Sequence, residues 1–324
     1  MNLHTAKRWI GPGVGILLMT YLLWRMPWVE ALRTLRQVRL SWWLPALALG
    51  TLGVWLRALR LHWVLGSPKP LFGIWRSVVL GYLAGLVVPA GGGELVKLRT
   101  LMKARGLDLL HAGSAVTLDR LFDLAGLALG LALLGSLQEL PGPVGTLVRS
   151  MVFLLLFIGL FLVLFLSRGK AYVTRLSLAL AHRPWLAGKM GRLGAVLDEA
   201  EHLRGSRIWI RLLLLQLFIT AFEVLTATIA LRALPFTVPL PPWAGLQVLM
   251  FSAIGFALPL LPGAAGSLQV AYILALRPFG VPIPQALAFS LLAHLGHVLV
   301  IVGHGGLAFL LRPDARCPSK AGLS

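Results

Sequence analysis

Two stretches of sequence decide the fold of this chain: Val87-Val-Pro-Ala-Gly-Gly-Gly-Glu94 and Leu261-Pro-Gly-Ala-Ala-Gly-Ser-Leu-Gln269. Each interrupts an apolar segment with a cluster of proline and glycine, and the two interruptions stand at corresponding places in the two halves of the chain. Proline lacks a backbone donor and glycine is a poor helix former, so a helix is expected to end at each cluster. Paired interruptions in an apolar chain favour the substrate site of a membrane transporter.

The composition indicates an integral membrane protein. Of the 324 residues, 58% are hydrophobic and 13% are charged, whereas soluble domains contain about 25% charged residues. Several stretches reach the roughly 20 apolar residues that a helix needs to cross a bilayer. No run of alternating strands of about 10 residues predicts a β-barrel. The expected fold is therefore all-α.

The net charge of +19 comes from 30 Lys and Arg against 11 Asp and Glu. Because these cations lie between apolar segments, we interpret most of them as signals of membrane topology and as partners of anionic lipid headgroups. We therefore expect no nucleic-acid partner. The only cysteine, Cys317, lies in a polar tail, which leaves no internal disulfide and no cysteine metal site. No cofactor is expected.

The apolar segments place the membrane spans. They lie at about 10–26, 42–65, 71–88, 109–135, 144–166, 208–232, 243–261 and 284–311. The shorter helices 94–104 and 267–279 follow the interruptions and cannot cross a bilayer alone. This predicts about six full transmembrane helices and two broken, re-entrant helix pairs. Pro27 and Trp28 follow the first span where a cleavage site would need small residues, so that span is expected to stay uncleaved.

The placement of Lys and Arg predicts the topology. The segment 167–207 carries Arg168, Lys170, Arg175, Arg183, Lys189, Arg192, Arg204 and Arg207, so it should be cytoplasmic. The loops 136–145 and 235–243 carry one glutamate and no charge, respectively, and should be external. The chain is then a multi-pass inner-membrane protein with a cytoplasmic C-terminus. Its halves, 42–166 and 208–311, would have opposite topology and form an inverted repeat.

One group of cations stands against this topology. Arg33, Arg36 and Arg39 would lie outside, and we assign them to an interfacial helix over 28–40 whose cations meet the headgroups. An external N-terminus with a full third span is the alternative topology.

Both interruptions are candidate substrate sites. Broken backbone in hydrocarbon must be buried in protein or line a wet cavity, and the first N–H groups of the helix that follows can bind an anion. The alternative is that the glycines only let helices pack closely. Neutral Ser267 and Gln269 should leave N–H groups free, whereas Glu94 would repel phosphate unless a neighbouring cation offsets it. The candidate residues are Pro89, Gly91, Gly93, Glu94, Lys97, Arg99, Pro262, Gly263, Gly266, Ser267 and Gln269.

Charged residues inside the spans are further candidates, because charges are costly in a bilayer and usually functional. Asp119, Arg120 and Asp123 can share one helix face, as a structural ion pair, a functional site or both. Arg120 should pair with Asp123 or Glu94. Glu223 stands without a charged neighbour in its span and is either a proton-coupling site or a hydrogen-bonded core carboxyl.

Three histidines share one side of the last span. His294, His297 and His304 fall within an arc of about 80° at 100° per residue. This arrangement fits a metal site, a proton relay or a polar stripe packed inside the bundle.

The two motifs resemble a known family. Pro89-Ala-Gly-Gly-Gly-Glu94-Leu-Val-Lys97-Leu-Arg99, followed by Asp119-Arg120-Leu-Phe-Asp123, resembles the Pro-x-x-x-Gly-Glu and Glu-Arg-x-x-Asp pattern of the lysylphosphatidylglycerol synthase transmembrane-region family, also called flippase-like. Pro262-Gly-Ala-Ala-Gly266-Ser-Leu-Gln269 resembles the Pro-Gly-Gly-x-Gly-x-x-Glu segment of that family. The likeness covers about residues 10–311.

The resemblance implies a polytopic inner-membrane protein that moves a polar lipid between leaflets. We expect the chain to lack the cytoplasmic synthase domain of multidomain relatives. Asp119 and Gln269 each replace a glutamate of the family pattern. The second replacement removes a titratable group and puts in doubt any coupling through that carboxylate.

Three classes of function follow from the sequence. The leading hypothesis is a transporter or flippase for an anionic phospholipid or a polyprenyl-linked lipid. The second is a membrane-embedded transferase, for which Asp119 and Asp123 could bind Mg²⁺, but the chain offers no second acidic cluster, and we expect no enzyme activity. The third is a non-catalytic scaffold that docks lipid- or glycan-synthesis enzymes on the segment 167–207.

Overall fold

The computed structural model describes residues 26–66, 70–88, 92–138, 205–257 and 262–311, together with a few isolated residues elsewhere. Within these ranges the chain is helical and contains no strand. The expected spans 10–26 and 144–166 and the cytoplasmic segment 167–207 lie almost entirely outside the described residues, as do Pro89 and Gly91.

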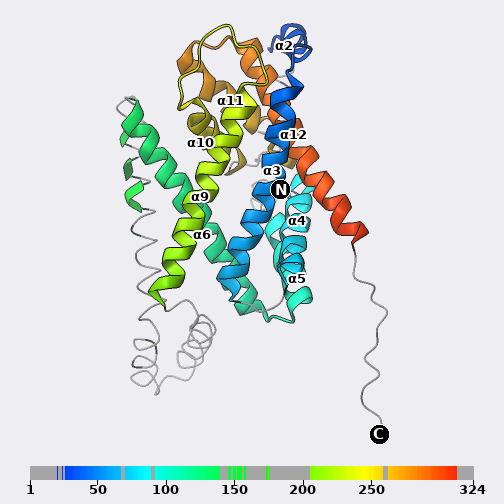
Figure 1. Ribbon diagram of the computed structural model, residues 1–324, viewed down its shortest axis with the longest axis vertical. Helices are drawn as coiled ribbons and strands as arrows, with labels where there is room; N and C mark the ends of the chain where they lie inside the picture. The colour runs from blue at the N-terminus through cyan, green and yellow to red at the C-terminus, as the bar shows by residue number, and fades with distance from the viewer. Residues whose placement is uncertain are drawn as a thin grey trace, which may run out of the picture.

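Among the described residues, four long helices form the body of the bundle (Figure 1). They are α3 (Leu40–Leu65), α6 (Leu109–Leu137), α9 (Ser206–Leu231) and α12 (Ile283–Leu310). Each is long and apolar enough to cross a membrane, because 26 to 29 residues extend about 40 Å and the hydrocarbon core is about 30 Å thick. The all-α membrane fold is therefore confirmed, and these helices begin and end within two residues of the expected spans.

Two pairs of shorter helices lie between the long ones. In the first half, α4 (Leu71–Val87) packs against α5 (Gly92–Arg105). In the second, α10 (Ala244–Ala257) packs against α11 (Ser267–Leu276), which follows the 3-10 turn η2 (Pro262–Ala264) and precedes η3 (Arg277–Phe279). With 10 to 17 residues, each helix extends roughly 15–25 Å and is too short to cross alone.

The two short pairs occupy opposite ends of the bundle. In Figure 1, α4 and α5 lie in the lower half and α10 and α11 at the top. Each half thus runs in the order long helix, short pair, long helix, as the sequence predicts. The superposition of the two halves as an inverted repeat, and the total number of spans, stay predictions.

The flanks of the two interruptions meet inside the bundle. A β-carbon built on Gly263 would lie 3.6 Å from the carbonyl oxygen of Leu86 and 3.8 Å from Nε2 of His294. The turn η2 therefore packs against the end of α4, next to α12. The start of the second motif therefore lies beside the last turn of α4, just before the first motif.

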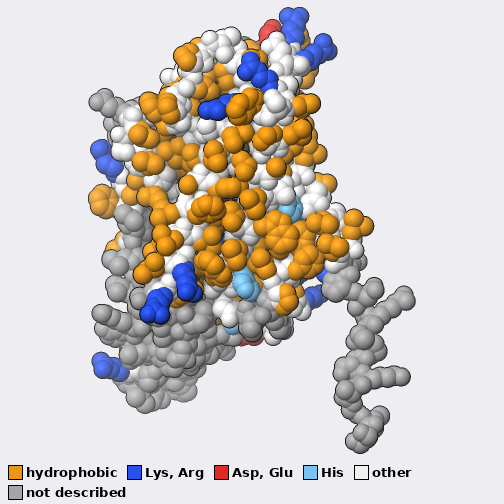
Figure 2. Space-filling model, in the orientation of Figure 1, with side chains coloured by type: hydrophobic (Ala, Val, Ile, Leu, Met, Phe, Trp, Pro, Cys, Tyr) orange, Lys and Arg blue, Asp and Glu red, His pale blue; other side chains and the backbone are white. Residues whose placement is uncertain are grey.

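A short amphipathic helix, α2 (Trp28–Leu35), precedes α3 and packs against α12. Its Ala31 is buried, while Val29 and Leu32 are exposed. It is shorter than the expected 28–40, because the N–H groups of Gln37 and Val38 donate three residues back, to Thr34 and Leu35, in a turn that ends the helix. The N–H of Arg39 then donates to the carbonyl of Ala233 at 2.8 Å. In Figure 2, hydrophobic side chains cover the middle of the visible face and most Lys and Arg lie toward its ends, as expected of a protein surrounded by lipid.

We predict that Gly81→Ala destabilises the fold, because α4 and α5 approach closely at this position. A β-carbon on Gly81 would lie 2.8 Å from Cβ of Lys97 and 3.1 Å from the carbonyl oxygen of Gly93. The free energy of unfolding should fall by about 1–3 kcal/mol, measured by SDS titration in mixed micelles. The control is Gly53→Ala in α3, where nothing lies within 4 Å of the added atom. An equal response of the two variants would contradict the close packing of α4 on α5.

Candidate functional site

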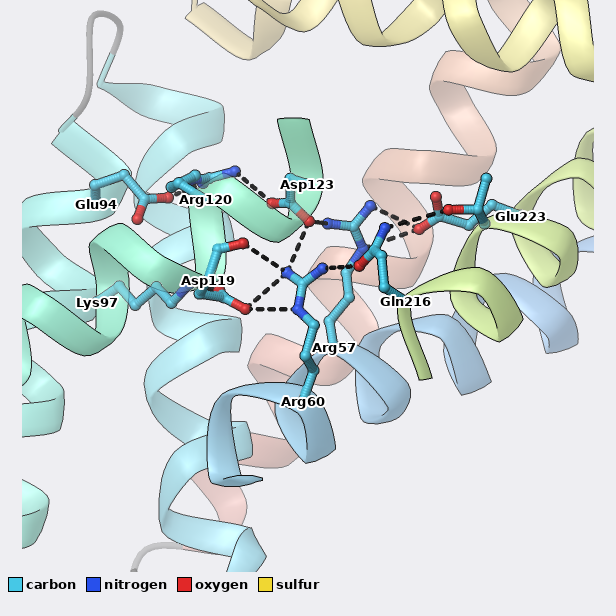
Figure 3. Close-up of polar contacts among 10 residues, drawn as sticks. Arg57, Arg60, Glu94, Lys97, Asp119, Arg120, Asp123, Gln216 and Glu223 are labelled. Atoms are coloured by element: carbon cyan, nitrogen blue, oxygen red, sulfur yellow. Dashed lines mark hydrogen bonds and ion pairs between the residues drawn. The ribbon is translucent and has the colours of Figure 1, made fainter. Parts of the chain in front are cut away.

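A network of charged side chains links α3 to α5, α6 and α9 inside the bundle. Arg57 and Arg60 stand three residues apart in this helix and carry the network. Neither residue is among the candidates named from the sequence. A signal for both was present, because arginines inside an apolar span are functional candidates by default. Figure 3 shows how side chains of α5, α6 and α9 converge on them.

Arg60 is the centre of the buried half of the network, which consists of Arg60, Lys97, Asp119 and Gln216. The side chain of Arg60 is 0% exposed, and its Nε and Nη2 donate to Oδ1 of Asp119 at 2.9 and 2.6 Å. Its Nη1 donates to the amide oxygen of Gln216. Lys97, 2% exposed, donates from Nζ to Oδ2 of Asp119 at 2.6 Å. These contacts join α3, α5, α6 and α9.

Arg57 belongs to the open half of the network, which consists of Arg57, Glu223, Arg120 and Glu94. Nε and Nη2 of Arg57 donate to Oε1 of Glu223 at 2.9 and 2.6 Å. The two side chains are 26% and 25% exposed. Arg120, 45% exposed, pairs with Glu94. The open half therefore presents cations and carboxylates that a ligand can reach.

Asp123 joins the two halves. Its Oδ1 accepts from Nη1 of Arg57 at 2.9 Å and from Nη2 of Arg60 at 2.7 Å. Its Oδ2 accepts from Nη1 of Arg120 at 3.1 Å. One carboxylate thus serves three guanidinium groups on two helices.

The charges of the network balance. Four cations, Arg57, Arg60, Lys97 and Arg120, pair with four carboxylates, Glu94, Asp119, Asp123 and Glu223. Charge inside a span is tolerated when it is paired and hydrogen-bonded. A neutral network can hold α3, α5, α6 and α9 together. It gains a net charge whenever an ionic ligand enters or one of its side chains changes its protonation.

The structure confirms one expectation about these residues and corrects another. Arg120 pairs with both Asp123 and Glu94, as predicted. Glu223 does not stand alone, because Arg57 reaches it from α3. Arg99 is exposed and takes no part in the network drawn in Figure 3.

The second interruption has a different chemistry, with uncharged partners. Oε1 of Gln269 accepts from the N–H of Gly266 at 2.7 Å, and Oγ of Ser267 donates to the carbonyl of Ala264 at 3.0 Å. Nε2 of Gln269 lies 3.0 Å from Nδ1 of His294. The expectation of a free N–H is therefore wrong at Gly266, whose donor is capped by the side chain of Gln269. Ser267 and Gln269 are also buried, so this helix start does not stand open.

The three histidines of α12 have separate partners. His294 contacts Gln269, and the ring of His297 lies tilted against that of Phe256, with ring centroids 4.8 Å apart. His304 is buried against Trp75, and its Nδ1 lies 3.0 Å from the carbonyl oxygen of Val300. Among the described residues, no group of three or more His, Cys, Asp or Glu side chains could hold a metal ion.

A family model described as the lysylphosphatidylglycerol synthase TM region matches residues 8–305. The matched range contains both interruptions and every residue of the charged network. No match is found among curated proteins or solved structures.

We predict that Arg60→Gln destabilises the fold far more than Arg120→Gln. Arg60 is fully buried, and its loss leaves Asp119 and Asp123 short of a partner, which typically costs about 3–5 kcal/mol. Arg120 is nearly half exposed, and such pairs contribute about 1 kcal/mol or less. The measurement is the free energy of unfolding by SDS titration, with Arg99→Gln as the exposed control. Equal losses for Arg60→Gln and Arg120→Gln would overturn this division of the network.

Proposed function

Because this chain belongs to the lysylphosphatidylglycerol synthase TM region family, we propose that it transports a polar, phosphate-containing lipid between the two leaflets. The family links the chain to membrane lipids, and the long apolar helices make it a multi-pass membrane protein. The proposal places it in the inner membrane with a cytoplasmic C-terminus. It assigns the chain no enzymatic activity.

The observation that carries the proposal is the partly exposed pair of Arg57 and Glu223 within the spans. A guanidinium binds phosphate through two parallel hydrogen bonds, and it does so more strongly where water is excluded. Nε and Nη2 of Arg57, the two donors suited to this geometry, now point at one oxygen of Glu223. A lipid phosphate that reaches Arg57 therefore competes with Glu223 for the same donors.

This competition supplies a link between binding and movement. Arg57 lies on α3 and Glu223 on α9, so a phosphate that displaces the carboxylate weakens one tie between these helices. While this tie is weakened, the buried half of the network still holds α3 against α6, because Arg60 and Asp119 are too deeply buried for the ligand to reach. Binding of the lipid headgroup would therefore loosen the contact between α3 and α9.

The interrupted helices supply the second support. Non-helical backbone at membrane depth is tolerated where protein covers it or where it lines a cavity, and here the ends of α4 and η2 meet beside α12. We assign the passage of the headgroup to this region. Glu94 and the prolines and glycines of the two motifs stay proposed substrate contacts, with Arg57 added to them. Arg99 is left out because it lies outside the charged network, and Lys97, Ser267 and Gln269 are left out because they are buried.

The proposal predicts lipid movement in vesicles that contain only the purified chain. Acyl-labelled NBD-phosphatidylglycerol or NBD-phosphatidylcholine is placed in both leaflets, and dithionite then bleaches the outer one. The protein should increase the bleached fraction for at least one lipid over that of protein-free vesicles. Arg57→Gln should slow the bleaching at least about tenfold, because it removes a charge-assisted contact to phosphate. Arg99→Gln is the matched control and should keep the rate. Equal bleaching with and without protein, for both lipids, would refute the function.

We further predict that Glu223→Gln tightens the binding of an anionic lipid. The substitution removes the carboxylate that competes for Arg57, so short-chain phosphatidylglycerol should bind severalfold more tightly in isothermal titration calorimetry. Asp108→Asn is the control, because it makes the same change of charge at an exposed helix cap that bonds only the N–H of His111 among the described contacts. Unchanged binding by Glu223→Gln, or an equal gain in both variants, would show that Arg57 is not the phosphate receptor.

A further inference from the structure

The junction between η2 and α11 holds an unusual backbone. Gly263, Ala264 and Gly266 have φ angles of 63°, 56° and 83°. Ala264 is buried, and an L-residue with a side chain rarely adopts this region. Such a segment persists only where its surroundings hold it in place.

Two side chains hold this segment, Gln269 from α11 and His294 from α12. The amide of Gln269 has a fixed orientation, because its Oε1 accepts from the N–H of Gly266 at 2.7 Å. Its Nε2 therefore faces Nδ1 of His294, 3.0 Å away. Since Nε2 of an amide can only donate, Nδ1 of His294 must accept.

The orientation of the amide thus determines which ring nitrogen of His294 carries the proton. A neutral ring with an accepting Nδ1 carries its proton on Nε2. That nitrogen faces Gly263, because it lies 3.8 Å from the position of a β-carbon built on this glycine. Neutral His294 therefore lies against both sides of the interruption, beside Gly263 before it and Gln269 after it.

We propose that His294 is a proton-operated latch, which holds the start of α11 when neutral and releases it when protonated. A second proton would occupy Nδ1 and turn it into a donor that faces the NH₂ of Gln269. If the amide rotates to offer its oxygen, Oε1 leaves the N–H of Gly266 and the cap of α11 is lost. Protonation of one ring is thereby linked to the backbone of the interrupted helix. As a gate, the latch rests on the proposed transport function, but its test needs no transport.

Few titratable groups among the described residues lie near His294, and His297 is one of them. His297 lies one turn further along α12 and within electrostatic reach of both His294 and Arg57 of α3. Tyr82 of α4 faces Arg57. The described residues of η2, α10 and α11 carry no charged side chain, and Tyr272 of α11 packs on Phe289 instead. His297 is therefore the group from which His294 must be distinguished.

The test is hydrogen–deuterium exchange of the full chain in lipid nanodiscs at about pH 8 and about pH 5, a range in which histidine changes its charge. After correction for intrinsic exchange rates, the amide of Gly266 should exchange about tenfold faster at the lower pH, because one hydrogen bond is lost. His294→Gln should abolish this acceleration. His297→Gln should retain it.

Gln269→Glu provides an independent variant that keeps the histidine. A carboxylate accepts both from Gly266 and from a protonated ring, so the cap should survive at low pH and the acceleration should disappear. The proposal is overturned if the wild-type amide shows no acceleration, if the acceleration persists in His294→Gln, or if His297→Gln removes it. Because exchange is read without lipid movement, a negative result here leaves the vesicle assay of transport unaffected, and the reverse also holds.

Discussion

The packing of the long helices depends on one carboxylate that three arginines share. Asp123 of α6 accepts from Arg57, Arg60 and Arg120, and a bilayer offers no water to take its place. Each guanidinium that enters a span must find an anion there, since an unpaired charge in hydrocarbon is costly. The position of α3 relative to α6 therefore follows from charge pairing, and the apolar packing of α3 on its neighbours is built around this requirement.

The network divides into parts with different freedom to change. Arg60, Lys97 and Asp119 are within 5% of complete burial, so ligands and water cannot compete for their bonds. Arg57 and Glu223 are a quarter exposed, and a ligand can compete for theirs. Helix α9 is attached to both halves of the network, through Gln216 to Arg60 and through Glu223 to Arg57. If a phosphate binds at Arg57 as proposed, the tie through Glu223 is lost and only the uncharged contact of Gln216 remains from the α9 side. Of the long helices, α9 is then the one most affected.

The sequence predicts the long helices well and the site only in part, for a physical reason. The spans α3, α6, α9 and α12 follow from local counts of apolar residues, and the pairing of Arg120 with Asp123 follows from their spacing on one helix. Glu223 and Arg57 are 166 positions apart, and no local pattern connects them. The same holds for Gln269 and His294, 25 positions apart. The sequence marked Glu223 as a proton-coupling or hydrogen-bonded carboxyl and Gln269 as part of an anion site, but only the packing of α9 and α12 shows their partners.

The two interrupted pairs are held by interactions of unequal strength. In the first half, α5 is tied to α6 through Lys97 and Asp119, a buried ion pair whose disruption costs about 3–5 kcal/mol. In the second half, the described polar ties at the start of α11 are uncharged hydrogen bonds from Gln269 and Ser267, each with a net contribution of about 0.5–1.5 kcal/mol. The backbone of η2 also holds Ala264 at positive φ, which lowers the cost of leaving the observed conformation. If the two pairs move unequally, the weaker ties and the strained turn place the larger motion in α10 and α11, while α4 and α5 stay with the charged network.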